Sequence, residues 1–263
     1  MVAALDWGRV VSSGVADSQQ SAIAEFDEKH RRLTMLASFV MPGGALREDL
    51  ASVLADQILL GYVGISELYF RRILSSLAEL CAETRARVAT KKISFGSIDH
   101  YSPGRLTLAL SEDSSYSDGE SVKSLLKKDI GLSEDSIRGL QDRLADFSVV
   151  CQLRHAIVHS GGFVNFRVAQ QIGAVRVPRD AVITLGFAEL EMAAAACLSL
   201  VRSVNQEVAR ELVWRDTLAG RIVGDRRKDR ARVKKYFEHF GDEGGTSTED
   251  ELHKCIRVCV QRM

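Results

Sequence analysis

Proline and aromatic residues are scarce in this chain of 263 residues, which contains three prolines and 6% Phe, Trp and Tyr. Aromatic residues favour strands, whereas Ala, Leu, Arg and Glu, which are abundant here, favour helices. The composition therefore predicts an all-α protein rather than a β-sandwich. The length is sufficient for one large domain or two small ones.

Cysteine is also too sparse for a disulfide scaffold. The five cysteines are odd in number and scattered through segments with helical patterning, which indicates a reducing, cytoplasmic setting. We see neither an N-terminal signal-peptide pattern nor an uninterrupted apolar run of bilayer length, so we expect no membrane partner. The net charge of zero argues against a protein that is basic all over, and leaves room for local patches.

The chain is expected to divide into three helical segments, and it contains no internal repeat. Residues 1–44 form an N-terminal helical extension, whose helix at about 17–39 is stopped by "MPGG". Residues 45–213 form the main helical bundle. Residues 214–263 form a charged helical tail of two pieces, which a Gly-rich stretch separates.

The longest apolar segment of the predicted bundle is residues 45–87, which read as nearly continuous helix and, being apolar almost all round, as buried helix. Gly61 and Gly64 mark a kink or a close helix contact in it. The other predicted elements are loops at 90–104 and 112–120, helices at about 120–130 and 133–159, a short β-hairpin or extended loop at 173–186, and a buried helix from residue 187.

The stretch "CQLRHAIVHSGG", residues 151–162, places reactive side chains on an otherwise apolar helix. His155 and His159 are four residues apart and therefore share one face of the helix, with Arg154 beside them. Three aliphatic residues between the histidines are expected to be buried, and the two glycines predict the end of the helix.

Three interpretations of this stretch compete. The polar side chains could simply face solvent on a core helix. They could bind a metal ion, but a metalloprotease needs Glu after the first His, where Ala156 stands, and no third ligand is evident. They could also act on phosphodiesters, because metal-free RNA cleavage needs a base that titrates near neutral pH and a fixed cation for the charge that builds on the phosphate.

"RHAIVHSGG" resembles the Arg-x4–6-His motif of the HEPN superfamily (higher eukaryote and prokaryote nucleotide-binding domains). Its members are helical bundles, and many are metal-independent RNases of toxin–antitoxin, phage-defence and RNA-processing systems. His155 matches the polar residue that usually follows the arginine. "GISELYFRRILSSLAELC" resembles the bundle helix that packs against the motif helix, and "KKISFGSI" resembles the connector of bacterial defence-associated members. The resemblance covers about residues 50–213.

The resemblance also implies a homodimer, in which two chains bring their motif helices together across a two-fold axis. One cleft would then hold two copies of Arg154, His155 and His159. Arg232 and His239 also match the motif spacing, but they lie in the charged tail without the aliphatic residues and the Gly-Gly stop. We therefore prefer Arg154 and His159.

Two further residues are expected to support this site. Glu67, a lone acid in an apolar helix, resembles an acid on the partner helix of the superfamily. It could orient Arg154 or Arg71, or form a structural ion pair. Ser160, which directly follows His159, is the second supporting candidate.

Two basic clusters are candidates for RNA-backbone contact, because phosphates dominate nucleic-acid affinity. Residues 221–235 hold eight basic and two acidic residues, a pattern that also fits a solvated helix face. The second cluster comprises Arg85, Arg87, Lys91 and Lys92. By contrast, the spacing of His and Cys in "HKCIRVC" fits an amphipathic helix and no standard metal site.

We therefore expect a cytoplasmic, homodimeric, HEPN-type endoribonuclease that needs neither metal nor cofactor and acts as a toxin or phage-defence effector. RNA is the expected substrate, and an antitoxin or defence-system protein is a further expected partner. His159 would activate the ribose 2′-OH or orient the phosphate, Arg154 would stabilise the phosphorane, and His155 would assist. The products would be 2′,3′-cyclic phosphate and 5′-hydroxyl ends. The alternatives are a catalytically inactive HEPN-like module that binds nucleotide or protein, and a purely structural helical dimer.

Overall fold

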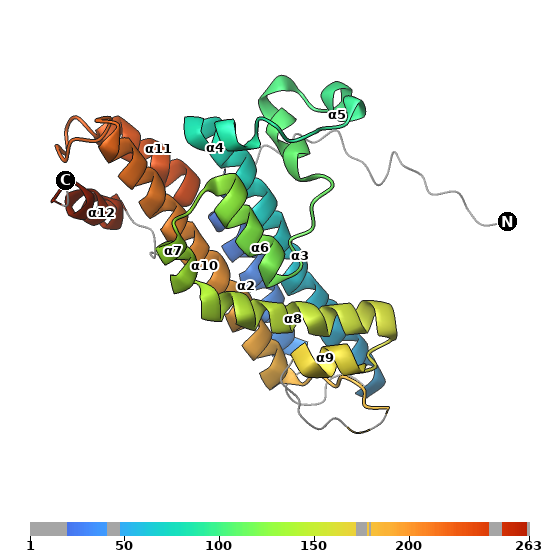
Figure 1. Cartoon of the computed structure of the whole chain (residues 1–263). Helices are drawn as coiled ribbons and strands as arrows, with labels where there is room; N and C mark the ends of the chain where they lie inside the picture. Colours follow the sequence, from blue (N-terminus) through green and yellow to red (C-terminus); the bar gives the residue numbers. More distant parts are fainter. Residues whose placement is uncertain (1–19, 41–47, 172–177, 179, 242–248, 262–263) are drawn as a thin grey trace.

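The computed structural model describes residues 20–40, 48–171, 178, 180–241 and 249–261. Over these residues the chain is all-α, as predicted (Figure 1). The helices are α2 (Ala22–Val40), α3 (Glu48–Leu80), α4 (Ala82–Val88), α5 (Phe95–His100), the 3₁₀ helix η1 (Pro103–Ser111), α6 (Gly119–Ser124), the π-helical η2 (Leu125–Ile130), α7 (Glu134–Gly139), α8 (Gln141–Ser160), α9 (Phe166–Gln171), α10 (Phe187–Leu218), α11 (Arg230–Phe240) and α12 (Glu249–Gln261).

Three long helices, α2, α3 and α10, pack lengthwise against one another and form the body of the molecule (Figure 1). α8 crosses α3 and α10 on one side, and α11 and α12 pack against the opposite end of α10. One cluster of buried apolar side chains runs from Ala22 to Cys259 and includes residues of all three predicted segments. The division of the chain into these three segments stays a prediction.

α3 is the central helix of this bundle. By length and composition, residues Leu50–Leu80 are apolar enough to cross a membrane, although polar residues interrupt the segment. In the structure, Leu59, Phe70 and Ile73 of this helix are fully buried in the core. Its apolar character is therefore used in packing against α2, α8 and α10.

The glycine at position 61 allows a close contact between α2 and α3. A Cβ at this position would lie 3.0 Å from Leu33 Cδ1, so a larger residue would require the Leu33 side chain to shift. α3 nevertheless continues without a break from Glu48 to Leu80. Gly61 therefore marks a close contact and no kink, whereas a Cβ at Gly64 would meet open space.

Some predicted boundaries differ from the structure. α2 begins at Ala22 because Ser21 Oγ accepts a hydrogen bond from the N–H of Ala24 at 3.1 Å; residues 17–19 lie outside the described part. The predicted loop at 90–104 contains α5 and the start of η1.

The hairpin predicted at 173–186 is not confirmed. The described residues contain no β-strand, only an isolated antiparallel bridge between Phe163 and Val182. Residues 181–183 therefore pair with the segment that follows α8, because Val164 N–H donates to Ala181 O and Ile183 N–H donates to Gly162 O. Residues 172–177 and 179 lie outside the described part.

Candidate functional site

The candidate site lies on the C-terminal half of α8. This helix ends at Ser160 because Gly161 and Gly162 adopt the left-handed conformation, with φ of 58° and 84°. Gly162 N–H donates to the carbonyl of Ala156 at 3.1 Å, which closes the last turn. The Gly-Gly stop predicted from the sequence is thus confirmed, and it fixes the helical turn that carries His159.

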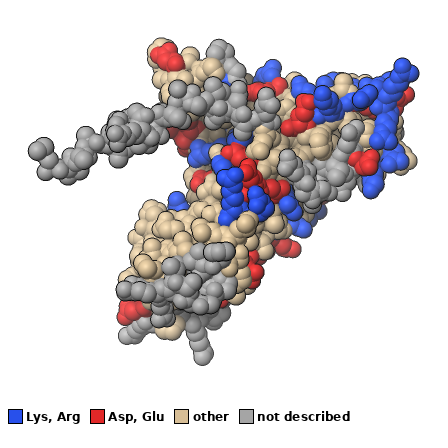
Figure 2. Space-filling view, turned by 180° about the vertical axis from the view of Figure 1, so that it is seen from behind, with Lys and Arg blue, Asp and Glu red and all other residues tan. Residues whose placement is uncertain are grey.

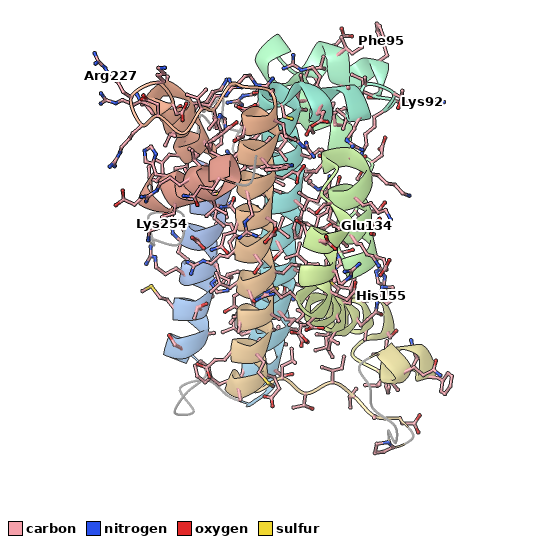
Figure 3. All side chains as sticks on the ribbon, turned by 60° about the vertical axis from the view of Figure 1, so that its left-hand side comes forward. Lys92, Phe95, Glu134, His155, Arg227 and Lys254 are labelled. Atoms are coloured by element: carbon pink, nitrogen blue, oxygen red, sulfur yellow. The ribbon has the colours of Figure 1, made fainter. Side chains whose placement is uncertain are left out.

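The two histidines of the motif form a close pair. The ring centroids of His155 and His159 are 4.6 Å apart, with 46° between the ring planes, and both residues are exposed. Arg154 is half-buried. His155 projects outward from α8 at the edge of the bundle (Figure 3). The aliphatic residues between the histidines divide differently than expected, because Ala156 is buried whereas Val158 is exposed.

Arg154 and His155 line a cleft of about 670 Å³ between α8 and the beginning of α6. We call this the α6–α8 cleft. The charged and amide side chains around it include Asp118, Glu120, Asp146, Gln152, Arg154 and His155. His159 is not among the lining residues. Within one chain, Arg154 and His155 therefore share the cleft, while His159 lies beside His155 but outside the cleft.

α6 approaches α8 so closely because residue 119 is glycine. A Cβ there would overlap both Ser148 Oγ and the carbonyl oxygen of Leu144. Instead, the Gly119 N–H donates to Ser148 Oγ at 3.0 Å. Asp118 caps α6 by accepting from the N–H of Ser121 at 2.7 Å. The wall of the cleft that faces α8 is therefore fixed by hydrogen bonds from backbone N–H groups to the side chains of Ser148 and Asp118.

Glu67 fixes the loop that leads into this wall. Its Oε1 accepts a hydrogen bond from the N–H of Tyr116 at 2.9 Å and from Ser115 Oγ at 3.1 Å. Arg71 Nη2 lies 3.8 Å from the same oxygen. Of the two arginines proposed as its partner, Glu67 therefore pairs with Arg71, and it acts on the cleft through the loop rather than through Arg154.

Arg71 completes this arrangement from the next turn of α3. Its guanidinium donates to the carbonyl oxygens of Ser111 and Ser114 and lies 5.9 Å from the ring centroid of Tyr116. "SELYFRR" thus clamps the 111–116 loop, a role that its pattern in the sequence did not indicate.

Cys151 forms part of the floor of the α6–α8 cleft and is buried. Burial, followed by the proximity of Cys197, raises the pKa of the Cys151 thiol well above its ordinary value. Burial likewise raises the pKa of Cys197 to about 12. Both thiols are therefore protonated near neutral pH, and neither is poised as a nucleophile.

The predicted RNA-binding cluster on and after α4 lies at the other end of the bundle from His155, as Lys92 and His155 show in Figure 3. Arg85 donates to the carbonyls of Ala78 and Glu79 and so caps the end of α3. Lys91 pairs with Asp129 at 2.5 Å. Arg85, Arg87 and Lys92 are exposed without an ion pair to another described residue, and of these three Arg85 is used in the helix cap.

The remaining candidates have structural positions. Ser160 is the last residue of α8 and accepts, through its carbonyl, from the N–H of Phe163 at 3.1 Å. The tail segment with His253 and Cys259 is an amphipathic helix, α12, that packs on α10 and α11. Within the described part of the chain, no group of three His, Cys, Asp or Glu is arranged to hold a metal ion.

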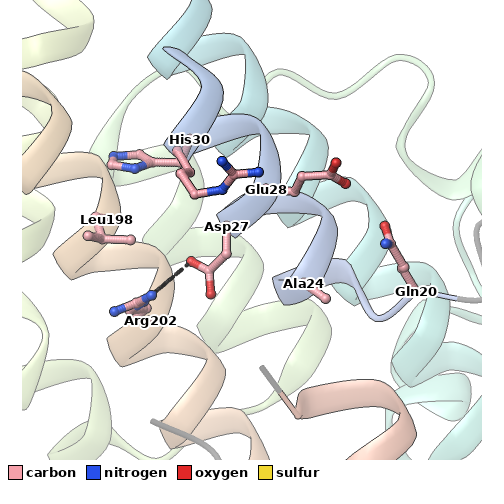
Figure 4. Close-up of a pocket in the computed structure, with 8 residues that line it drawn as sticks. Gln20, Ala24, Asp27, Glu28, His30, Leu198 and Arg202 are labelled. Atoms are coloured by element: carbon pink, nitrogen blue, oxygen red, sulfur yellow. Dashed lines mark hydrogen bonds and ion pairs between the residues drawn. The ribbon is translucent and has the colours of Figure 1, made fainter. Parts of the chain in front are cut away.

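A second pocket, of about 480 Å³, lies between α2 and α10 (Figure 4). Arg202 donates to Asp27 Oδ1 at 3.3 Å, and the buried His30 donates through Nε2 to the carbonyl of Ala194 at 2.9 Å. Burial lowers the pKa of His30, more than the bond to Ala194 and the charge of Asp27 raise it. No sequence pattern pointed to this pocket, because "EFDEKHRR" reads as a solvated helix face and its partners are about 170 residues away.

Comparison of the chain with protein-family models, with curated proteins and with solved structures finds no match. The assignment to the HEPN superfamily therefore stays a prediction from the motif residues.

Proposed function

We propose that this protein is a metal-independent endoribonuclease that uses Arg154, His155 and His159 of α8. The observation that carries the proposal is the exposed His155–His159 pair on one rigid helix, with the Arg154 guanidinium one residue away. These groups are accessible to a substrate and supply both a proton acceptor and a fixed cation. Metal-free cleavage of RNA requires this combination.

The chemistry divides among three groups. A neutral imidazole takes the proton of the ribose 2′-OH, and the 2′-oxygen attacks phosphorus. The bond from phosphorus to the 5′-oxygen breaks, and a protonated imidazole supplies the proton to that oxygen. Two imidazoles whose centroids are 4.6 Å apart can share these roles, while Arg154 stabilises the charge on the phosphorane. The products are a 2′,3′-cyclic phosphate and a 5′-hydroxyl.

A second copy of the chain completes this site in the proposal. Arg154 faces the α6–α8 cleft and His159 lies outside it, so a two-fold contact along α8 would bring the Arg154 of one chain toward the His159 of the other. The surface around His159 carries exposed apolar side chains suited to such a contact, namely Val158, Phe163, Phe166 and Val182.

The biological setting belongs to the same proposal. An RNase without a metal requirement must be restrained in the cytoplasm, where its substrate is present. A toxin or phage-defence effector with an antitoxin or defence-system partner meets that condition. The sequence resemblance to such systems supports this setting.

One observation favours the alternative, a catalytically inactive binding module. The α6–α8 cleft contains Asp118, Glu120 and Asp146 as well as Arg154. Carboxylates accept hydrogen bonds and repel phosphates, so this cleft by itself fits a ligand with N–H donors, such as a nucleobase or a peptide, better than a bare phosphate.

Incubation of the purified chain with total RNA in EDTA distinguishes the two. Cleavage by the wild type, with 2′,3′-cyclic phosphate ends, and none by His159→Ala supports the nuclease. Absence of cleavage by both favours the binding module.

A further inference from the structure

We infer that the basic end of the molecule, formed by residues 221–235 together with α12, binds the phosphate backbone of RNA at a site separate from the α6–α8 cleft. That the polyanion is RNA rests on the proposed function. The existence of a polyanion site rests on the charges and contacts of the basic end itself.

The acidic residues within the basic end are used to build its backbone. Asp229 is buried and accepts from the N–H groups of Val223 and Gly224 at 3.1 and 2.8 Å. Asp225 accepts from the N–H groups of Arg227 and Lys228 at 2.8 and 3.0 Å. Both carboxylates thus fold the turn before α11.

Two of the eight basic residues of this segment are also structural. Arg221 and Arg232 both bond the buried carboxylate of Asp216, which Tyr236 contacts as well. This network holds α11 against α10. The other cations of the segment point outward, and Arg227, Lys228, Arg230 and Lys235 are exposed without an ion pair to any other described residue.

α12 adds cations to the same surface. Its apolar face, with Leu252 and Ile256, is buried, whereas Lys254 and Arg257 are exposed. Arg227 and Lys254 project from the same side of the molecule (Figure 3), and Lys and Arg side chains gather at this end in Figure 2, while the opposite end shows few charges.

A groove of about 490 Å³ separates the turn from α12. Its polar lining consists of Arg226, Asp229, Asp250, His253, Lys254 and Arg257. Of the two acids, Asp229 is buried in the turn, and Asp250 pairs with Arg226 at 3.4 Å on the largely exposed rim, so the positive charge of the groove comes from Lys254 and Arg257. A groove edged by guanidinium and ammonium groups fits a chain of phosphates, which arginine binds through paired N–H donors.

RNA fits this surface better than an anionic membrane does. A helix that lies on a bilayer needs a free apolar face to insert among the lipids. Most of the apolar side chains of α11 and α12 are already used, since Val233, Tyr236 and Phe240 of α11 and Leu252 and Ile256 of α12 are buried in the protein core, while Phe237 and Val258 are partly exposed. The basic end also supplies what the α6–α8 cleft lacks, because three carboxylates line that cleft.

The test is RNA binding by the full chain carrying His159→Ala, which prevents cleavage of the probe. Affinity for a fluorescein-labelled single-stranded RNA is measured by anisotropy over a series of salt concentrations. Adding Arg227→Glu and Arg257→Glu is expected to weaken binding about tenfold or more. The slope of log affinity against log salt should also fall by about 0.7 for each phosphate that the variant no longer binds.

The matched control is Lys128→Glu with Arg138→Glu. Both residues are exposed, Lys128 on η2 and Arg138 on α7. Glu134 of α7 lies on the opposite side of the bundle from Arg227 in Figure 3, and the change in net charge is the same. This control should retain its affinity. Unchanged circular-dichroism melting of both double variants establishes that they are folded.

Three results would overturn the inference: no RNA binding by the parent, equal losses in the test and control variants, or binding to phosphatidylserine vesicles but not to RNA through Arg227 and Arg257. Failure of the proposed function looks different. The wild type would then fail to cut RNA in EDTA, while binding would still depend on Arg227 and Arg257.

Discussion

His155 and His159 lie on successive turns of α8 with their ring centroids 4.6 Å apart, and both are exposed to solvent. His155 also lines the α6–α8 cleft beside Arg154, whereas His159 does not. His155 therefore connects the two parts of the motif within one chain. The Arg-x4–6-His motif names only Arg154 and His159. In the structure, His155 is the residue that lies close to both.

Replacing either motif residue by alanine should separate catalysis from folding. For His159→Ala we expect a loss of about 10²–10⁴-fold in cleavage rate, typical of a missing acid or base, and for Arg154→Ala about 10²–10³-fold. His159 is exposed and Arg154 is half-buried without an ion pair to another described residue, so unfolding free energies should change by about 0.5 kcal/mol or less. Single-turnover cleavage and thermal melting on the same preparations check this. Early melting of both variants, or full activity, would remove the catalytic assignment.

Phe166→Asp should weaken the proposed dimer. Phe166 is 78% exposed, so the substitution costs the monomer little, but a carboxylate in an apolar two-fold contact would appear twice and remain unpaired. Sedimentation equilibrium should show a shift toward monomer. Phe95→Asp is the matched control, because Phe95 is also 78% exposed and lies at the far end of the molecule in Figure 3. If both variants keep the same oligomeric state as the wild type, the contact is elsewhere.

Glu67 is expected to act as a positioning residue. Glu67→Ala leaves the Tyr116 N–H without its acceptor and removes the carboxylate beside Arg71, whose guanidinium still donates to the carbonyls of Ser111 and Ser114. The lost hydrogen bond should cost about 1–3 kcal/mol of stability and loosen the cleft wall. Glu67→Gln retains an acceptor oxygen for the Tyr116 N–H. This variant should therefore keep most of the stability and most of the cleavage activity. Urea unfolding and the separate kcat and KM values for RNA cleavage are the measurements. Equal effects of the two substitutions would contradict a hydrogen-bonding role.

The buried imidazole of His30 should make stability depend on pH. Burial against Phe26 and Tyr62 lowers its pKa below the ordinary 6.5, so the unfolded chain binds a proton more readily than the folded chain. The contribution of neutral His30 to the free energy of unfolding is therefore fully present above about pH 6.5. It is lost as the pH falls through the lowered pKa. Asp27 and Arg202 are the charged groups that also act on this ring, and their effects are opposite in sign.

His30→Gln provides the comparison, because glutamine can still donate to the carbonyl of Ala194. Unfolding free energies measured between about pH 8 and about pH 5 should fall more steeply for the wild type than for His30→Gln. If the unfolding free energies of the wild type and the variant changed in parallel with pH, His30 would have the same pKa in the folded and the unfolded chain.

The helices could be predicted because apolar periodicity and glycine stops act locally. The break between α3 and α4 at Cys81 could not be predicted, and residues 45–87 were expected to form nearly continuous helix. Nothing in the neighbours of Cys81 breaks a helix, yet α3 ends there with φ of −118° and ψ of 117°, and Arg85 caps the freed carbonyls. Arg215, 134 residues away, reaches the Cys81 thiol at 3.7 Å. Such breaks are set by tertiary contacts that no local pattern contains.

In the candidate site, too, the residues on one helix could be predicted and those brought together by tertiary contacts could not. "RHAIVHSGG" identified the α8 residues, since their relation is fixed by the helix itself. The opposite wall could not be predicted, because Asp118 and Arg154 are 36 positions apart in the sequence and meet only through the contact of Gly119 with α8. The clamp of Glu67 and Arg71 on the 111–116 loop depends on backbone groups and leaves no residue pattern at all.

The most direct test of the proposed nuclease is cleavage of total RNA in EDTA by the wild-type chain and by His159→Ala, with chemical identification of the new ends. We predict that only the wild type cuts, and that it leaves 2′,3′-cyclic phosphate and 5′-hydroxyl ends. Cleavage that requires added metal, or equal cleavage by both proteins, would contradict a metal-independent site built on His159.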